Sequence, residues 1–186
     1  FFDGYYDLWE DFLELFEMNW GECPFPLYII NNEKNLKFEK NYNVQVFHAG
    51  KDAEYSRKVQ LALEKIDAEY YLLLLEDFFI GEQLNRDVLS STLNYIDSNK
   101  IRYYRMPLNE FISNNKKGKV EKISPSMEYT LSCQPSIWKK SFLKECIGED
   151  NYNAWIFEGI YVKSQKAHTV EFLKGCYVDY RNILRL

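Results

Sequence analysis

The stretch Tyr70-Tyr71-Leu72-Leu73-Leu74-Leu75-Glu76-Asp77-Phe78-Phe79 decides the fold class. Its first six residues form a continuous apolar run, which is typical of a strand buried on both faces in a parallel sheet. The acidic pair Glu76-Asp77 stands where this strand ends. Because ligands in open α/β sheets bind outside the carboxyl ends of the strands, we interpret the pair as part of a site.

Helices and strands alternate on both sides of this run. The expected elements are a helix from Leu8 with Phe12, Leu15 and Phe16 on one face, strands over 26–30 and 44–47, a helix over 59–66, the strand over 70–75, a helix over 88–96, strands over 101–106 and 129–134, and a helix that carries Trp138, Phe142 and Cys146 and ends at Gly148. Residues 113–122 read as a polar surface loop. This order predicts an α/β fold with a mostly parallel central sheet flanked by helices.

The composition fits one globular domain over residues 1–186, with 46% hydrophobic and 27% charged residues. A formal net charge of -5 offers no attraction to nucleic acid or to anionic lipid, so neither is an expected partner. There is no membrane-spanning run and no signal-peptide pattern. The four cysteines form no CxxC pair, so we expect reduced thiols in a cytoplasmic protein and neither a zinc site nor a disulfide framework.

Aromatic residues make up 17% of the chain, and tyrosine, with 15 copies, is the commonest of them. A tyrosine ring has an apolar body and a polar tip, which suits the wall of a wet cleft. We therefore expect part of this aromatic surplus to line a binding site.

Three segments carry residues suited to chemistry. Carboxylates such as Glu76 and Asp77 are hard oxygen ligands for Mg²⁺ or Mn²⁺, although a turn cap and an ion pair are alternative roles. Arg57 stands in the first turn of the helix that precedes the acidic strand and could bind a phosphate, unless it is an ordinary surface residue. Glu158 lies between aromatic residues in Trp155-Ile156-Phe157-Glu158, a setting that suits a general base, whereas a helix-start acid is the alternative.

Together these segments resemble the GT-A-type glycosyltransferases of bacterial polysaccharide biosynthesis, similar to glycosyltransferase family 2. The resemblance is carried by four stretches in a fixed order. They are Ser56-Arg57, Leu75-Glu76-Asp77-Phe78-Phe79, Ser132-Cys133-Gln134-Pro135-Ser136-Ile137-Trp138 and Trp155-Ile156-Phe157-Glu158. It extends from Asp3 to about Gly175 and implies a single GT-A-like catalytic domain that begins at the end of its first strand.

The resemblance implies a hexosyl-type transferase that moves a sugar from a nucleotide-activated donor to a glycan or lipid-linked glycan acceptor. Asp3, Tyr5, Arg57 and Glu76 would bind the nucleotide sugar, and Asp77 would hold a divalent metal. Glu158 would be the general base of an inverting reaction. An acceptor of this kind would place the protein at the cytoplasmic face of the membrane.

The acidic motif departs from the Asp-x-Asp pattern of these enzymes, because Phe78 stands at the second Asp. A metal, Mn²⁺ or Mg²⁺, held by Asp77 and the donor phosphates remains one alternative, and a metal-free site neutralised by Arg57 or a cationic loop is the other. Two further functions stay open at this point. One is a non-catalytic module of the same fold that binds a glycan or a nucleotide, and the other is a glycoside hydrolase.

Overall fold

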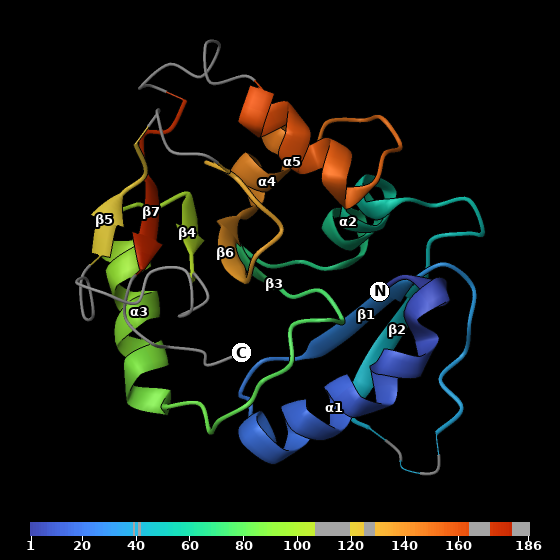
Figure 1. Cartoon of the computed structure of the whole chain (residues 1–186). Helices are drawn as coiled ribbons and strands as arrows, with labels where there is room; N and C mark the ends of the chain where they lie inside the picture. Colours follow the sequence, from blue (N-terminus) through green and yellow to red (C-terminus); the bar gives the residue numbers. More distant parts are fainter. Residues whose placement is uncertain (39, 41, 107–119, 125–128, 164–171, 180–186) are drawn as a thin grey trace.

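The computed structural model describes residues 1–38, 40, 42–106, 120–124, 129–163 and 172–179, and it has the α/β architecture that the sequence predicts (Figure 1). Its elements, in chain order, are η1 (Asp3–Tyr5), α1 (Tyr6–Trp20), β1 (Leu27–Asn31), β2 (Val44–His48), α2 (Tyr55–Lys65), β3 (Tyr70–Leu73), α3 (Arg86–Ser98), β4 (Tyr103–Arg105), β5 (Val120–Lys122), β6 (Ser136–Lys139), α4 (Lys140–Ile147), α5 (Ala154–Lys163) and β7 (Cys176–Asp179). Within these described ranges no helix is both long and apolar enough to cross a membrane.

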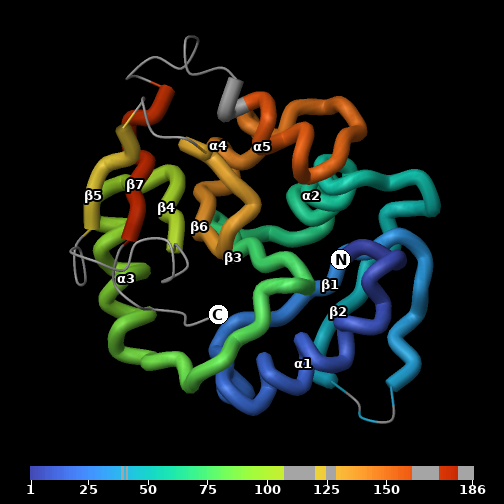
Figure 2. The backbone as a smooth tube through the Cα atoms, in the orientation of Figure 1, coloured from blue at the N-terminus to red at the C-terminus, as the bar shows by residue number. Residues whose placement is uncertain are grey.

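The strands form two sheets. The smaller sheet is the parallel pair β1 and β2, in which Leu27 is aligned with Val44 and Asn31 with His48. The larger sheet has the order β3-β6-β4-β7-β5, with β4 and β7 parallel and the other neighbours antiparallel. The backbone trace shows the smaller sheet beside β3, with the amino terminus next to β1 (Figure 2).

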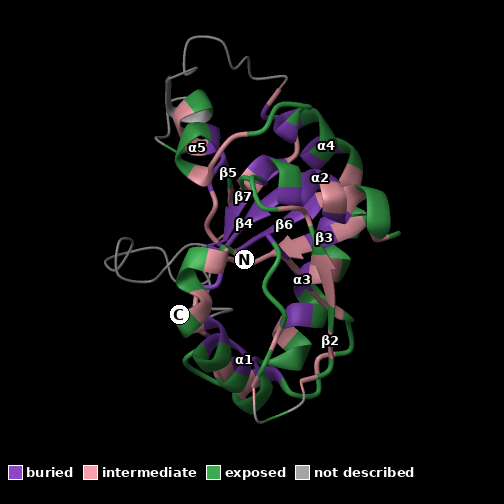
Figure 3. Ribbon diagram, turned by 90° about the vertical axis from the view of Figure 1, so that its right-hand side faces the viewer, coloured by how far each residue is buried: buried purple, intermediate pink, exposed green. Residues whose placement is uncertain are grey.

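Successive side chains of a strand point to opposite faces of the sheet, so the core is divided into two parts, one on each face of the larger sheet. Tyr103 and Trp138 pack with α2, α4 and α5, while their neighbours Tyr104 and Ile137 pack with α1 and α3. Buried positions accordingly run through β4, β6 and β7 (Figure 3). Helices therefore cover both sides of the sheet, as in a layered α/β domain.

The expected helices and strands are confirmed except near residues 129–138. Residues 129–134 form turns and bends, and the strand begins at Ser136 instead. Trp138 belongs to this strand, β6, where it lies opposite both Tyr71 and Tyr103, so the helix begins only at Lys140. Packing between aromatic residues on three strands thus overrides the helical spacing of Trp138, Phe142 and Cys146.

Two further differences concern the long apolar run and the first helix. The sequence predicts a mostly parallel central sheet, but among the described strands the larger sheet is mixed: β3 pairs with an antiparallel strand, and only β4 and β7 are parallel. Leu72 and Leu73 are accordingly only half-buried. On α1 the buried face is formed by Trp9, Phe12, Leu13, Phe16 and Trp20, a stripe turned slightly from the expected one. Most of the expected loop over 113–122 lies outside the described residues, although its last three residues form β5.

Candidate functional site

The amino terminus contacts two strand ends, namely the end of β1 and the segment that follows β3. The Phe1 ammonium donates a hydrogen bond to the Ile30 carbonyl oxygen (2.7 Å), and the Phe2 N–H donates one to Glu76 Oε1 (2.8 Å). Glu76 is buried, with 5% of its surface exposed. These two bonds hold η1 at the carboxyl edge of both strands, which is the edge where α/β proteins bind ligands.

Asp3 is bonded to the turn that follows β1. Its Oδ2 accepts hydrogen bonds from the backbone N–H groups of Glu33 and Lys34 (both 2.9 Å). Its Oδ1 accepts from the Asn32 N–H and from Asn31 Nδ2 (both 3.1 Å). Burial opposes ionisation, but the backbone hydrogen bonds outweigh it and lower the pKa of the Asp3 carboxyl. Asp3 therefore acts as an anion that organises this turn.

Two buried asparagines extend the turn toward β2. Asn31 is fully buried, and its Oδ1 lies 2.8 Å from Nδ1 of His48 at the end of that strand. The Asn32 side-chain amide donates to three backbone carbonyls, of which the shortest contact is to Ala53 (2.7 Å). Polar side chains thus tie the ends of β1 and β2 to the loop that leads into α2.

Lys58 is the cation of α2 that faces the acidic residues. Only 8% of its surface is exposed, and its Nζ lies 5.2 Å from the centre of the Phe2 ring. Burial lowers the pKa of its ammonium, and the negative charges of Glu76 and Asp3 partly offset this effect. Lys58 therefore contributes a positive charge within electrostatic reach of both carboxylates.

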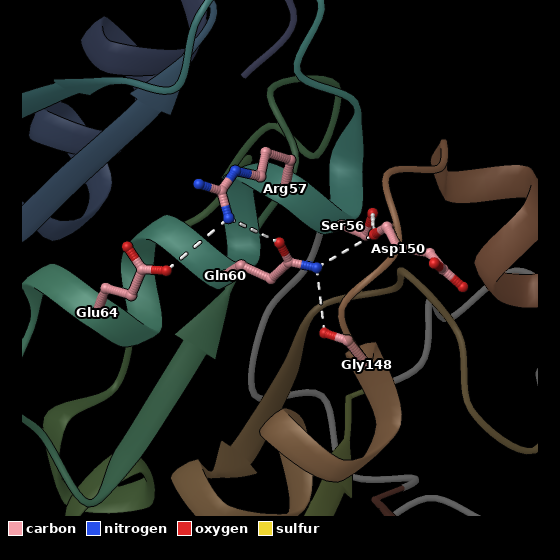
Figure 4. A network of polar contacts seen from close by, with 6 residues as sticks. All are labelled: Ser56, Arg57, Gln60, Glu64, Gly148 and Asp150. Carbon is pink, nitrogen blue, oxygen red and sulfur yellow. Dashed lines mark hydrogen bonds and ion pairs between the residues drawn. The ribbon is translucent and has the colours of Figure 1, made fainter.

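Arg57 lies along the outside of α2 instead (Figure 4). Its Nη1 donates to Gln60 Oε1 (3.1 Å) and lies 3.8 Å from Glu64 Oε1, and about half of its side chain is exposed. Adjacent helix positions differ by about 100° in direction. The structure consequently places Lys58 within electrostatic reach of Glu76 and Asp3, and it places Arg57 on the outside of the helix.

Ser56 and Gln60 join α2 to the loop that leads into α5 (Figure 4). Ser56 Oγ donates to the Asp150 carbonyl (2.7 Å) and accepts from the Tyr152 N–H (2.8 Å). Gln60 Nε2 donates to the carbonyls of Gly148 and Asp150 (both 3.1 Å). These contacts fix the start of α5 and with it the position of Glu158.

Asp77 differs from its neighbour Glu76 because it lies at the surface. Nearby atoms nevertheless partly desolvate its carboxyl, which raises the pKa of Asp77, and the charge of Glu76 adds to the increase. A hydrogen bond from its own backbone N–H acts in the opposite direction. An exposed carboxylate with this environment is suited to bind a cation or a proton.

Glu158 lies on α5 and contacts the segment before β6. Its Oε1 accepts a hydrogen bond from the Cys133 N–H (2.8 Å). Of its aromatic neighbours in sequence, Phe157 is fully buried whereas Trp155 is 73% exposed. Half-buried and held at one oxygen, the Glu158 carboxylate is oriented by the backbone of the segment that resembles the glycosyltransferase motif.

Cys133 lies within electrostatic reach of both Asp77 and Glu158. Burial raises the pKa of its thiol to about 12, and the charges of Glu158 and, more weakly, Asp77 add to this. Tyr55, on the first turn of α2, hydrogen-bonds the thiol in turn. Asp77 and Glu158, 81 positions apart in the sequence, therefore both lie within electrostatic reach of one side chain.

The structure thus brings together four of the six residues that the sequence proposes for the site. One set of charge interactions joins Lys58 with Asp3 and Glu76, and Glu76 with Asp77. Asp77 and Glu158 in turn both raise the pKa of the Cys133 thiol. Tyr5 lies at one end of this set, 45% exposed, with its ring against Phe2. Arg57 lies apart.

Sequence reasoning missed Lys58, Asn31 and Asn32. The signal for Lys58 was its position on the apolar face of the helix, next to Val59 and Ala62, both of which are buried. The signal for the asparagines was a polar pair directly after a buried strand. The bonding partners of all three come from distant segments, so their roles needed the tertiary structure.

The described residues contain no cluster of three or more His, Cys, Asp or Glu side chains that could hold a metal ion. Asp77 is the acid best placed to bind one, since Glu76 is buried and one of its oxygens accepts the Phe2 N–H. A metal at this site would need oxygen ligands from a bound substrate, as Mg²⁺ commonly has.

No protein-family model matches this chain, and no curated protein sequence does. Among solved structures it is similar to S. aureus TarS 1-349, with a TM-score of 0.54, 13% identity, and coverage of 82% of this chain and 52% of that one. The complex of TarS 1-349 with UDP-GlcNAc gives a TM-score of 0.56 at 12% identity, covering 85% and 51%. The chain spans about half the length of these two structures, and the likeness shows that it shares their fold.

Proposed function

We propose that this domain is a glycosyltransferase that uses a nucleotide-activated sugar. One observation carries the proposal: Glu158 is bonded to the Cys133 N–H, and Asp77 lies within electrostatic reach of the same residue, in a fold shared with a protein whose structure was determined in complex with UDP-GlcNAc. Transfer to a hydroxyl needs two opposite functions, a base for the acceptor and positive charge for the departing diphosphate. The site contains candidates for both.

Glu158 is the proposed general base. The bond from the Cys133 N–H holds Oε1, so the second oxygen can face an acceptor hydroxyl and remove its proton as the oxygen attacks the anomeric carbon. Direct attack by the acceptor, with no covalent sugar–enzyme intermediate, would invert the configuration at that carbon. The proposal therefore includes an inverting, hexosyl-type reaction.

Asp77 is the proposed ligand of Mn²⁺ or Mg²⁺, together with oxygens of the donor diphosphate. When bound, such a metal would stabilise the negative charge of the leaving nucleoside diphosphate. Lys58 lies beside Glu76 and is the cation of the described chain that is best placed to add to this effect. Tyr5 remains a candidate for stacking on the nucleotide base, since its ring is partly exposed.

The finer assignment within this proposal is a GT-A, family 2-like enzyme of polysaccharide or glycan biosynthesis. Its acceptor would be a glycan or a lipid-linked glycan, which would place the protein at the cytoplasmic face of a membrane. The order of the Ser56-Arg57, Glu76-Asp77 and Glu158 segments along the chain supports this assignment.

The test begins with thermal stabilisation of the 186-residue chain by UDP, UDP-GlcNAc and other nucleoside diphosphates and their sugars, with and without Mn²⁺. We expect at least one to raise the melting temperature, and Glu158→Gln to bind it equally well. Glu158→Gln should lower the rate of sugar transfer or of slow donor hydrolysis by about 10²–10⁴-fold. Failure of every nucleotide to stabilise the wild-type chain would refute the donor site.

The principal alternative is a binding module of the same fold without turnover. It predicts nucleotide or glycan binding that leaves the donor intact in the wild-type protein, with or without Mn²⁺. A glycoside hydrolase would instead cleave a glycan in the absence of any nucleotide. Both outcomes are distinguished by the same donor and product measurements.

A further inference from the structure

Helix α2 has a second contact surface besides the one near the acids, and it lies against the loop formed by residues 148–152. Ser56 is fully buried at this surface. Its Oγ donates a hydrogen bond to the Asp150 carbonyl (2.7 Å) and accepts one from the Tyr152 N–H (2.8 Å). Its own N–H donates to the Tyr152 carbonyl (3.0 Å). Ser56 and Tyr152 therefore exchange hydrogen bonds in both directions, which fixes the loop against the first turn of α2.

Other residues at the start of α2 bond to the same loop. Gln60 Nε2, one turn after Ser56, donates to two carbonyl oxygens of the loop (both 3.1 Å; Figure 4). Asn151 Oδ1 accepts the Glu54 N–H, and Asn151 Nδ2 donates to the Asp52 carbonyl (both 2.9 Å). The loop is thus held by α2 and by the residues just before it along most of its length.

The loop leads directly into α5, which begins at Ala154 and carries Glu158 about one turn later. Asn153 connects the two. Its Oδ1 accepts the Ile156 N–H (2.9 Å), as a capping side chain does at the start of a helix, and its carbonyl accepts the Phe157 N–H (3.1 Å). Because hydrogen bonds make one turn of a helix rigid, the end of the loop determines where the backbone of Glu158 lies.

Two further contacts depend on the position of α5. Tyr55, next to Ser56, has its ring 5.5 Å from the ring of Phe157, the residue before Glu158. On α5 itself, Glu158 Oε1 accepts the Cys133 N–H at 2.8 Å. Such bonds extend to about 3.2 Å, so a displacement of α5 by about 1 Å would break this one and release the carboxylate.

We propose that Ser56 is a positioning residue for Glu158 and acts through the loop 148–152. The inference rests on the proposed function, in which Glu158 is the general base, and it names the residue of α2 that fixes this base. Lys58, two positions along α2, points about 200° away from Ser56 and lies within electrostatic reach of the acids at the proposed donor site. Ser56 should therefore affect the transfer step and leave the binding of the donor unchanged.

The test measures kcat and the KM of the donor in Ser56→Ala, with the nucleotide sugar of the panel above that the wild-type chain turns over fastest. We expect kcat to fall about 10–10²-fold, since a displacement of about 1 Å can have an effect of this size, and KM to stay within about twofold. Tyr71→Phe is the matched control. It removes a hydroxyl hydrogen bond at the other end of α2, to the Ile66 carbonyl (2.6 Å), and should change neither constant.

A second readout needs no activity. Deuterium exchange of the Cys133 amide reports its bond to Glu158, and we expect it to be about tenfold faster in Ser56→Ala than in the wild type or in Tyr71→Phe. Gln60→Leu removes the bonds that the next turn of α2 makes to the loop. It should change kcat and the exchange rate in the same direction, so it replaces Ser56→Ala if that variant does not fold.

Three results would overturn the inference. The first is a Ser56→Ala variant with the kcat and the Cys133 exchange rate of the wild type. The second is an increase in KM alone, which would make Ser56 a donor-binding residue. The third is an equal fall of kcat in Tyr71→Phe, which would reflect general loss of stability. If the wild-type chain turns over no donor, the proposed function fails, and the Cys133 exchange rates alone then decide whether Ser56 positions Glu158.

Discussion

The carboxylates of the candidate site fall into two regions that differ in how their oxygens are used. In the support region, Asp3 accepts four hydrogen bonds from the turn after β1, and buried Glu76 accepts the Phe2 N–H. In the open region, Asp77 is exposed, and Glu158 is bonded at Oε1 to the Cys133 N–H. The difference indicates that acids of the same motif can hold the fold or remain accessible for chemistry.

The pKa shifts of the carboxyl groups also differ between the support region and the open region. Hydrogen bonds lower the pKa of Asp3, so its charge stabilises the fold. Desolvation raises the pKa of Asp77, so its charge opposes folding. Residues that bind ligands are commonly unfavourable for stability in this manner.

The largest effect on stability is expected from Asp3→Ala. Loss of the acceptor removes one hydrogen bond from each of two buried residues, at the Asn32 N–H and at the Asn31 side-chain amide, whereas the two exposed N–H groups turn to water. We expect the free energy of unfolding to fall by about 2–3 kcal/mol in urea denaturation. The control Asp11→Ala, on the exposed face of α1, should change it by less than about 0.5 kcal/mol. Equal effects of the two substitutions would remove the distinction between support and surface acids.

The amino terminus of the support region should make stability depend on pH. The pKa of the Phe1 ammonium is about 6 in the folded chain against 8.0 without burial, so between these values the unfolded state binds more protons. Stability should therefore rise as the pH increases from 6 to 8, by about 2 kcal/mol at most.

The measurement is urea denaturation of the chain that begins with a free Phe1 amine, repeated at several pH values. An acetylated Phe1 is the matched control, because it keeps an N–H donor and cannot titrate. If the acetylated chain shows the same increase, the dependence arises from other groups.

The smallest stability effect is expected at Asp77. Asp77→Asn removes a charge that opposes folding, so the melting temperature at pH 7 should stay within the equivalent of about 0.5 kcal/mol or increase. The same variant should lose the Mn²⁺-dependent part of any nucleotide stabilisation. A marked decrease in melting temperature would instead show that Asp77 stabilises the fold, as the acids of the support region do.

The sequence predicted most of the fold because the helix and strand periods are local properties. The run 70–75 and the helical stripes of α2 and α3 were found in this way. The error at 129–138 has a tertiary cause, since Trp138 is held in a strand by Tyr71 and Tyr103 from two other strands. Spacing along the chain carries no information about such partners.

The candidate site could be predicted only in part for a similar reason. Glu76 and Asp77 were recognised together, but the structure turns Glu76 inward to the Phe2 N–H and leaves Asp77 exposed. In the helix before them, Arg57 was chosen for its chemistry, while its neighbour Lys58 faces the acids. Side-chain direction at a strand end or on a helix depends on what each face packs against.

The sequence by itself determined that this is an acidic α/β chain whose carboxylates follow a buried strand, because composition and periodicity act over a few residues. Only the tertiary structure decided which of those carboxylates accept hydrogen bonds from the protein's own backbone. The partner of Glu76 lies 74 positions away, and the N–H that orients Glu158 lies 25 positions away. Hydrogen bonds across such separations form only when the packed strands and helices bring their ends together.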